Sequence, residues 1–193
     1  MATVNLNPSS TVSNQWTING GDGTVHGVLT DGSGTTSIRT ANQSRTSIVE
    51  LDDFNPSGYD NGINNVDGVS VTSIRHIIEG FVWATRGDDT DVQVIIDKGN
   101  GTTMYSENHN LTFNGYTPVT FNGTSRTTSD GSSAWAFGGL NLLRLNINTS
   151  PEDPPNISQA NVTEAKVEVT YDTSKVAKIL GVTHANVDKV NGV

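Results

Sequence analysis

The chain has 193 residues, of which 33% are hydrophobic and 16% charged, with a formal net charge of −9 and no cysteine. This length is enough for one domain of good size, and the absence of cysteine excludes disulfides, thiolate zinc sites and cysteine nucleophiles. The negative charge excludes the basic face that nucleic-acid binding requires and disfavours an anionic membrane as a partner. The N-terminus lacks a secretory signal pattern, and no apolar run is long enough to span a bilayer. We therefore expect synthesis in the cytoplasm.

Turn-forming residues punctuate almost the whole chain. Clusters of Gly, Asn, Asp and Pro separate short segments that are rich in β-branched and aromatic residues, a pattern typical of strands joined by tight turns. In chain order, the predicted strands are 15–18, 25–29, 47–51, 69–78, 80–85, 91–97, 103–105, 110–113, 117–121, 142–148 and 160–171. No convincing amphipathic helix interrupts them. The pattern predicts an all-β fold, an antiparallel β-sandwich of jelly-roll type with a short C-terminal extended arm.

The stretch EAKVEVTY at 164–171 has the clearest alternation. Its apolar members fall on one face and its polar members on the other, which predicts a strand with one wet face. A carboxylate pair for glycoside hydrolysis could be sought at Glu164 and Glu168, or at Asp52 and Asp53. Because Lys166 stands between the two glutamates on the polar face, we interpret that pair as part of a solvated surface.

The sequence offers no convincing catalytic or metal-binding arrangement. No H-x-H or H-E-x-x-H spacing connects the four histidines, which are His26, His76, His109 and His184. We expect His26 and His76 to be hydrogen-bonded histidines within strands. The oxygen-rich stretch 60–68 lacks the spacing and the closing glutamate of an EF-hand, so we expect a plain loop. The chain is therefore predicted to be no enzyme and to need no cofactor or metal.

Aromatic residues supply the remaining candidate site. Trp83 lies in a strand-like stretch, where a tryptophan buried between two sheets is the simplest interpretation. Trp135 follows a turn, and together with Tyr59 and Tyr116 it could form a platform on which a sugar ring stacks. Core packing and glycan contact both remain open for Trp135.

Four stretches in the second half of the chain share a recognisable pattern. They are VTSIR at 71–75, DGSSAW at 130–135, LNLLRL at 140–145 and TEAKVEVTY at 163–171. Together they resemble the β-sandwich domain of tailed-bacteriophage virion proteins, over roughly residues 65–172. The residues before this region are expected to form added strands or an arm. The resemblance implies a sandwich domain over 1–172, followed by a separate tail at 173–193.

The tail contains the same sequence motif twice. VAKILGV at 176–182 and VDKVNGV at 187–193 share the frame V-x-K-[I/V]-x-G-V, similar to the short repeats that end small structural proteins of environmental phages. Two such short strands are marginal in water by themselves, so we expect them to order on a neighbouring subunit's sheet edge or groove. Packing of the tail on its own domain is the alternative. The predicted assembly contacts are Val176, Lys178, Ile179, Val182, Val187, Lys189, Val190 and Val193.

The resemblance implies a non-enzymatic virion structural protein, namely a capsid-decoration, collar or tail-associated component. Its partners would be other virion structural proteins and further copies of itself as a homo-oligomer, with neither nucleic acid nor membrane as a partner, and its final location would be the virion. The alternative prediction is a carbohydrate-binding module that recognises host surface glycans through Trp135, Tyr59 and Tyr116.

Overall fold

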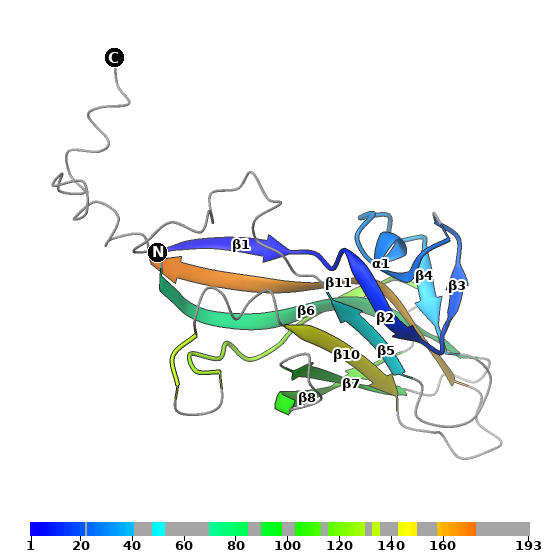
Figure 1. Cartoon of the computed structure of the whole chain (residues 1–193). Helices are drawn as coiled ribbons and strands as arrows, with labels where there is room; N and C mark the ends of the chain where they lie inside the picture. The colour runs from blue at the N-terminus through cyan, green and yellow to red at the C-terminus, as the bar shows by residue number, and fades with distance from the viewer. Residues whose placement is uncertain are drawn as a thin grey trace, which may run out of the picture.

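The computed structural model shows an antiparallel β-sandwich of jelly-roll type, in which two sheets face each other (Figure 1). It describes residues 1–21, 23–40, 48–52, 70–84, 90–97, 103–112, 116–129, 133–135, 143–149 and 158–172, with the backbone alone for 48–52, 83, 84, 90 and 158. Every strand pairing within these ranges is antiparallel. The predicted fold class is confirmed.

One sheet has six strands and is built around the two longest strands of the chain. Its members are β1 (Ala2–Leu6), β3 (Thr17–Asn19), β4 (Ser37–Arg39), β6 (Ser70–Ala84), β9 (Val119–Asn122) and β11 (Ser158–Asp172). The order is β3-β4-β11-β6-β9, and β1 pairs with the second half of β11. Because β1 and β4 lie along the same side of β11, the first strand of the chain ends up beside the last (Figure 1).

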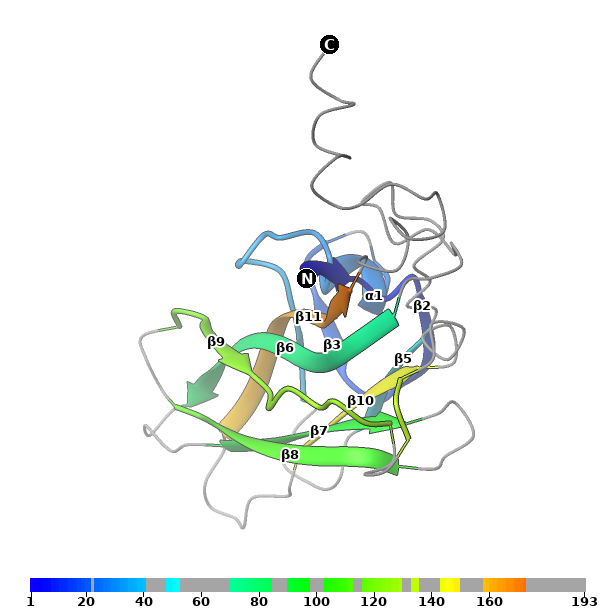
Figure 2. The same cartoon turned by 90° about the vertical axis from the view of Figure 1, so that its left-hand side faces the viewer.

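The second sheet has five strands in the order β2-β5-β10-β7-β8. These are β2 (Ser10–Asn14), β5 (Ile48–Asp52), β7 (Thr90–Asp97), β8 (Thr103–Leu111) and β10 (Arg144–Thr149). β8 is therefore the edge strand of one sheet and β9 that of the other. Figure 2 shows the segment after β9 running along β8, so that both edges close the same side of the sandwich.

The core lies between the sheets and is made of the alternate residues of each strand. The fully or nearly fully buried apolar side chains include Ile74, Ile78, Val82, Val92, Val94, Ile96, Leu145, Ile147, Val162, Val167 and Val169. Each contributes roughly 1.5–3 kcal/mol on burial, which is the main favourable term for a chain without disulfides. Period-two alternation thus determines which side of each strand faces inward.

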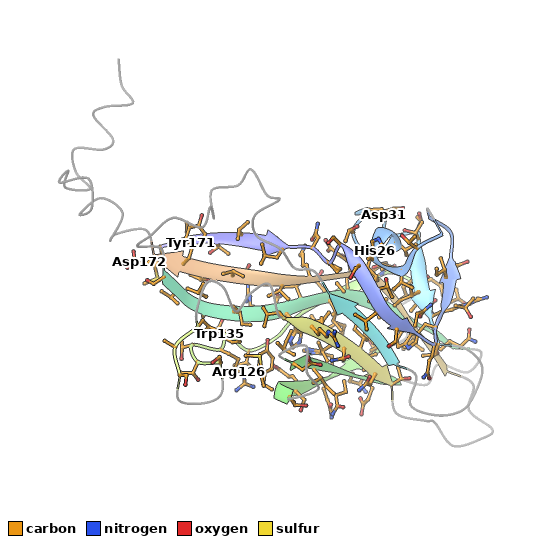
Figure 3. All side chains as sticks on the ribbon, in the orientation of Figure 1. His26, Asp31, Arg126, Trp135, Tyr171 and Asp172 are labelled. Carbon is orange, nitrogen blue, oxygen red and sulfur yellow. The ribbon has the colours of Figure 1, made fainter. Side chains whose placement is uncertain are left out.

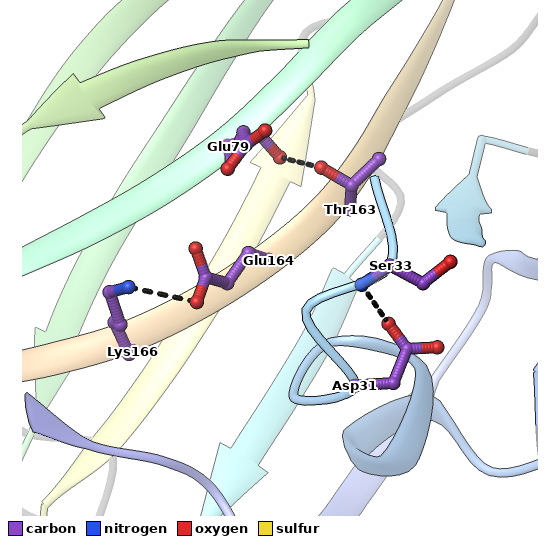
Figure 4. Close-up of polar contacts among 6 residues, drawn as sticks. All are labelled: Asp31, Ser33, Glu79, Thr163, Glu164 and Lys166. Atoms are coloured by element: carbon purple, nitrogen blue, oxygen red, sulfur yellow. Dashed lines mark hydrogen bonds and ion pairs between the residues drawn. The ribbon is translucent and has the colours of Figure 1, made fainter. Parts of the chain in front are cut away.

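The outer face of β11 is polar, as the alternation in 164–171 predicted. Lys166 Nζ lies 2.8 Å from Glu164 Oε1, and Arg75 Nε lies 2.6 Å from Glu168 Oε1. The register of β11 against β6 shifts between Val162 and Glu164. At this bulge the Thr163 hydroxyl donates a 3.2 Å hydrogen bond to the Glu79 carbonyl (Figure 4). The bulge therefore satisfies a backbone acceptor that the ladder leaves behind.

The strand predicted at 25–29 is wrong. Val25–Val28 forms the short helix α1, whose N-cap Thr24 accepts a hydrogen bond from the Gly27 N–H at 3.2 Å. Val25, Val28 and Leu29 are all buried, and the spacing i, i+3, i+4 is that of one helix face. The Leu29 carbonyl then accepts from the Ala165 N–H at 3.2 Å, which docks the turn on β11 between its contacts with β4 and β1.

Several strand boundaries also differ from the prediction. The segments predicted at 69–78 and 80–85 are one strand, β6, and those predicted at 103–105 and 110–113 are joined in β8. Strands β1, β2 and β4 were not predicted individually, although added strands were expected before residue 65. Polar residues such as Ser106 and Asn108 interrupt the β-propensity of β8, but pairing with β7 stabilises the strand through them.

Candidate functional site

Amide and hydroxyl side chains cover part of the outer face of the five-stranded sheet. We call it the amide face and define it as Gln93, Ser106, Asn108, Asn110, Asn146 and Asn148 around Ile95. The residues that alternate with these, among them Val92, Val94, His109 and Ile147, are buried, so the pleat directs the amide face to the outside. Ser106, Asn108 and Asn110 are exposed, and the others are half-buried.

The register aligns these side chains in rows across three strands. Asn148 of β10 is opposite Gln93 of β7, which is opposite Asn108 of β8. The next row contains Asn146, Ile95 and Ser106. Neighbouring strands are about 4.8 Å apart, and successive outward residues along a strand are about 6.7 Å apart. The result is a regular grid of uncharged polar groups with one apolar side chain at its centre.

Charged groups lie at the ends of the amide face and are engaged by amides. Asn110 Nδ2 donates to Asp91 Oδ1 at 3.0 Å, and Asn146 Nδ2 donates to the buried Asp97 Oδ2 at 2.6 Å. We call the row of Asn148, Gln93 and Asn108 the middle row. In this row the Asn148 Oδ1 atom is buried without a hydrogen-bond partner. Buried polar atoms are normally paired, so this oxygen is an unsatisfied acceptor beneath the row.

This surface can bind a ligand that is rich in hydroxyl groups. An Asn or Gln side chain offers two N–H donors and a carbonyl acceptor, which matches a hydroxyl that both donates and accepts. Ile95 supplies apolar area for the C–H face of a ring. The described side chains of the two central rows carry no charge. The arrangement is suited to equilibrium binding and contains no acid–base pair.

The predicted aromatic platform is not formed by Trp135. Its side chain is buried, and its Nε1–H donates a 2.8 Å hydrogen bond to the Arg126 carbonyl (Figure 3). Tyr116 is 48% exposed, but its ring makes a T-shaped contact with Phe81 of the six-stranded sheet, with centroids 6.3 Å apart. It therefore lies away from the amide face. Tyr59 lies outside the described residues. A tryptophan whose ring is buried and whose N–H is satisfied offers no face to a sugar.

A second polar cluster closes the edge of the sandwich. His76 of β6 and His109 of β8 are both buried, and their Nε2 atoms lie 2.6 Å apart. Two residues earlier on β8, the Glu107 carboxylate accepts from the Thr124 N–H at 2.9 Å and from its hydroxyl at 3.1 Å. These contacts join β8 to the opposite sheet and to the segment after β9.

Burial dominates the electrostatics of this edge. It lowers the pKa of His76 to about 4, with the positive charges of His109 and Arg126 acting in the same direction and Glu107 opposing them. Burial also lowers the pKa of His109. For Glu107, burial alone would raise the pKa, but the two hydrogen bonds from Thr124 and the nearby histidines hold it below its usual value. Both histidines are therefore neutral at pH 7.

Other predicted residues fall in different places. His76 is a hydrogen-bonded strand histidine as expected, whereas His26 lies in α1 and contacts the Thr11 hydroxyl at 3.0 Å. Trp83 belongs to β6, but its side chain lies outside the description, as do the stretch 60–68, His184 and all eight predicted assembly contacts. The assembly and virion roles stay predictions.

The described part of the chain holds no group of three or more His, Asp or Glu side chains placed to bind a metal ion. Within the same residues, no helix is long and apolar enough to cross a membrane.

Sequence reasoning missed the amide face and the histidine pair. A signal for the amide face was present, because QVI at 93–95, SENHN at 106–110 and NIN at 146–148 alternate polar and buried residues with period two. Nothing in the sequence places these segments in adjacent strands. His76 and His109 are 33 residues apart, and no local spacing connects them.

The matches to known proteins are structural and distant. No protein-family model matches the sequence, and no curated protein matches it in sequence. A solved structure described as "CBM4 structure and function", a carbohydrate-binding module, aligns over 81% of this chain and 95% of its own length, with 13% identity and a TM-score of 0.43. The CBM36-1 domain of a multidomain xylanase from the hindgut metagenome of Trinervitermes trinervoides aligns over 88% and 95%, with 6% identity and a TM-score of 0.38.

Proposed function

We propose that this protein is a non-catalytic glycan-binding module and that the amide face is its binding surface. The observation that carries the proposal is the row of Asn148, Gln93 and Asn108, aligned by register across three strands. Amides at strand spacing present donors and acceptors at regular intervals, as a chain of sugar hydroxyls requires. The sandwich holds these side chains on paired strands and so limits the conformational entropy lost on binding.

The chemistry of the surface favours uncharged sugars. The described side chains of the amide face itself carry no charge, Asp91 and Asp97 lie beside it, and the whole chain has a net charge of −9. A polyanionic glycan would be repelled by this field at low ionic strength. The ligand we propose is therefore a neutral polysaccharide whose chain crosses the strands along the middle row.

The test is binding of the purified chain to a panel of soluble neutral and acidic polysaccharides, by affinity electrophoresis and calorimetry. Gln93→Ala and Asn108→Ala should each weaken binding to the preferred neutral polysaccharide about three- to tenfold, the effect of one net hydrogen bond. Asn122→Ala removes an exposed amide from β9 on the other sheet and should leave affinity unchanged. Absence of binding across the whole panel, or equal loss in all three variants, would refute the proposal.

A further inference from the structure

The two histidines form a hydrogen bond that connects the two sheets at the edge of the sandwich formed by β8 and β9. His76 belongs to the six-stranded sheet and His109 to the five-stranded sheet, with 2.6 Å between their Nε2 atoms. Neighbouring rings enclose the pair, with Tyr105 stacked on His76 at 6.1 Å and Phe121 against His109 at 5.4 Å. The Gly123 backbone covers the His76 ring so closely that a Cβ there would lie 2.5 Å from Nδ1.

The surroundings of His76 determine which ring donates. A bond between two neutral imidazoles needs one Nε2–H and one Nε2 lone pair. His76 Nδ1 is buried without a partner. An unpaired buried N–H is rarer in proteins than an unpaired acceptor. His76 therefore carries its proton on Nε2 and donates, while His109 accepts on Nε2 and carries its proton on Nδ1.

An added proton cannot be accommodated in this arrangement. The singly protonated pair has three protons on four nitrogens, one of which is shared between the two Nε2 atoms. The other two must then be on the Nδ1 atoms, so His76 acquires a buried N–H without an acceptor together with a nearby buried charge. A second proton would place two N–H groups against each other at 2.6 Å. The first step keeps the bond between the sheets but destabilises the closed pair through the unpaired N–H and the buried charge, and the second step breaks the bond.

Charged and titratable groups surround the pair, and one of them can stabilise a protonated histidine after the pair has separated. On β8, Tyr105 and Glu107 flank the pair, and on the segment after β9 the Arg126 guanidinium lies over the Tyr105 ring at 5.1 Å. Arg126 opposes protonation of His76, whereas Glu107 favours the charged form of both histidines. Glu107 is two residues from His109 on the same face of β8, where its carboxylate can stabilise an imidazolium that has left the pair.

We propose that His76 and His109 form a pH-dependent latch, which closes the β8 edge of the sandwich at neutral pH and releases it in acid. The latch is independent of the glycan-binding function and stands or falls separately. Release moves His109 away from His76 and Phe121 and separates Glu107 from the Thr124 backbone. Since β8 also carries Ser106, Asn108 and Asn110 on its outer side, the same motion would shift one strand of the amide face.

The test is NMR of the full chain between pH 7.5 and pH 4.5. At pH 7.5, imidazole nitrogen shifts should show the Nε2–H form of His76 and the Nδ1–H form of His109, with ring contacts between His109 and Phe121. At pH 4.5 those contacts should be lost. Exchange of the Thr124 amide, which bonds to β8, should rise on the order of 50-fold relative to the Gly123 amide, which bonds to β6, given pKa values of about 6.5 and 4 for His76 in the open and closed states.

Two variants separate the latch from general acid sensitivity. His109→Gln keeps an acceptor for the His76 proton but removes one of the two titrating rings, so the acid response of its Thr124 amide should be smaller than that of the wild type. His26→Gln removes a partly buried histidine elsewhere and should respond like the wild type. Opposite tautomers at pH 7.5, unchanged Thr124 exchange in acid, or a wild-type response in His109→Gln would each overturn the latch. The tautomer and Thr124 exchange measurements on the wild type need no variant, and either can overturn the latch even if His109→Gln does not fold.

Discussion

Gly80 is enclosed by backbone atoms in the centre of the six-stranded sheet. It lies on β6, opposite Val162 on one side and Val119 on the other. A Cβ built on it would lie 2.5 Å from the Asn161 carbonyl oxygen and 3.5 Å from the Val162 Cα. Both atoms are backbone and cannot rotate away. Gly80→Ala therefore forces β6 and β11, the longest strand pair of the fold, to separate locally.

The expected destabilisation follows from this enclosure. Overpacking of one methyl group typically costs about 1–3 kcal/mol, and a backbone neighbour places the variant at the upper end of that range. For a domain of this size, 1 kcal/mol corresponds to a fall in Tm of about 2–4 °C, so Gly80→Ala should melt roughly 4–12 °C below the wild type. Its Asn161 neighbour is fully buried, which leaves no room for relaxation toward solvent.

Gly34→Ala is the matched control. The nearest heavy atom to its added Cβ is Pro118 Cγ at 3.9 Å, an ordinary contact, and the residue is exposed. Its free energy of unfolding should stay within about 0.5 kcal/mol of the wild type. Urea unfolding and thermal melts of the three proteins, followed by circular dichroism, provide the comparison. A Gly80→Ala protein that melts with the wild type would show that the β6–β11 register differs from the one described.

Three further predictions follow from the same structure. Stability should be fully present above pH 6.5 and fall by about 3 kcal/mol towards pH 4, because unfolded chains protonate His76 while the folded state, with its lowered pKa of about 4, does not; urea unfolding at a series of pH values measures this. Trp135→Phe should cost about 1 kcal/mol through the lost bond to the Arg126 carbonyl and leave glycan affinity unchanged, and a loss of binding would restore Trp135 to the site. Deleting 175–193 should leave the melting temperature unchanged, since every described strand ends at or before Asp172, whereas failure to fold would place the tail in the sheets.

The sequence by itself determined the fold class and the orientation of the most regular strand. The alternation in 164–171 correctly predicted which side chains of β11 are buried. This prediction succeeds because the side-chain period of a strand is a local property, readable from a few consecutive residues. The helix at 25–28 was missed because four residues are too few to distinguish a buried turn from a short buried strand.

The tertiary structure decided what the polar residues do. Asn108, Gln93 and Asn148 form a row because β8, β7 and β10 are neighbours in one specific register, and His76 meets His109 because two sheet edges close on the same side. The same closure buries Trp135, which the sequence left open between core and surface. Strand order and register depend on free energies summed over whole paired segments. No single spacing in the chain contains them, so local patterns gave the faces of the strands and only the folded sheets brought those faces together.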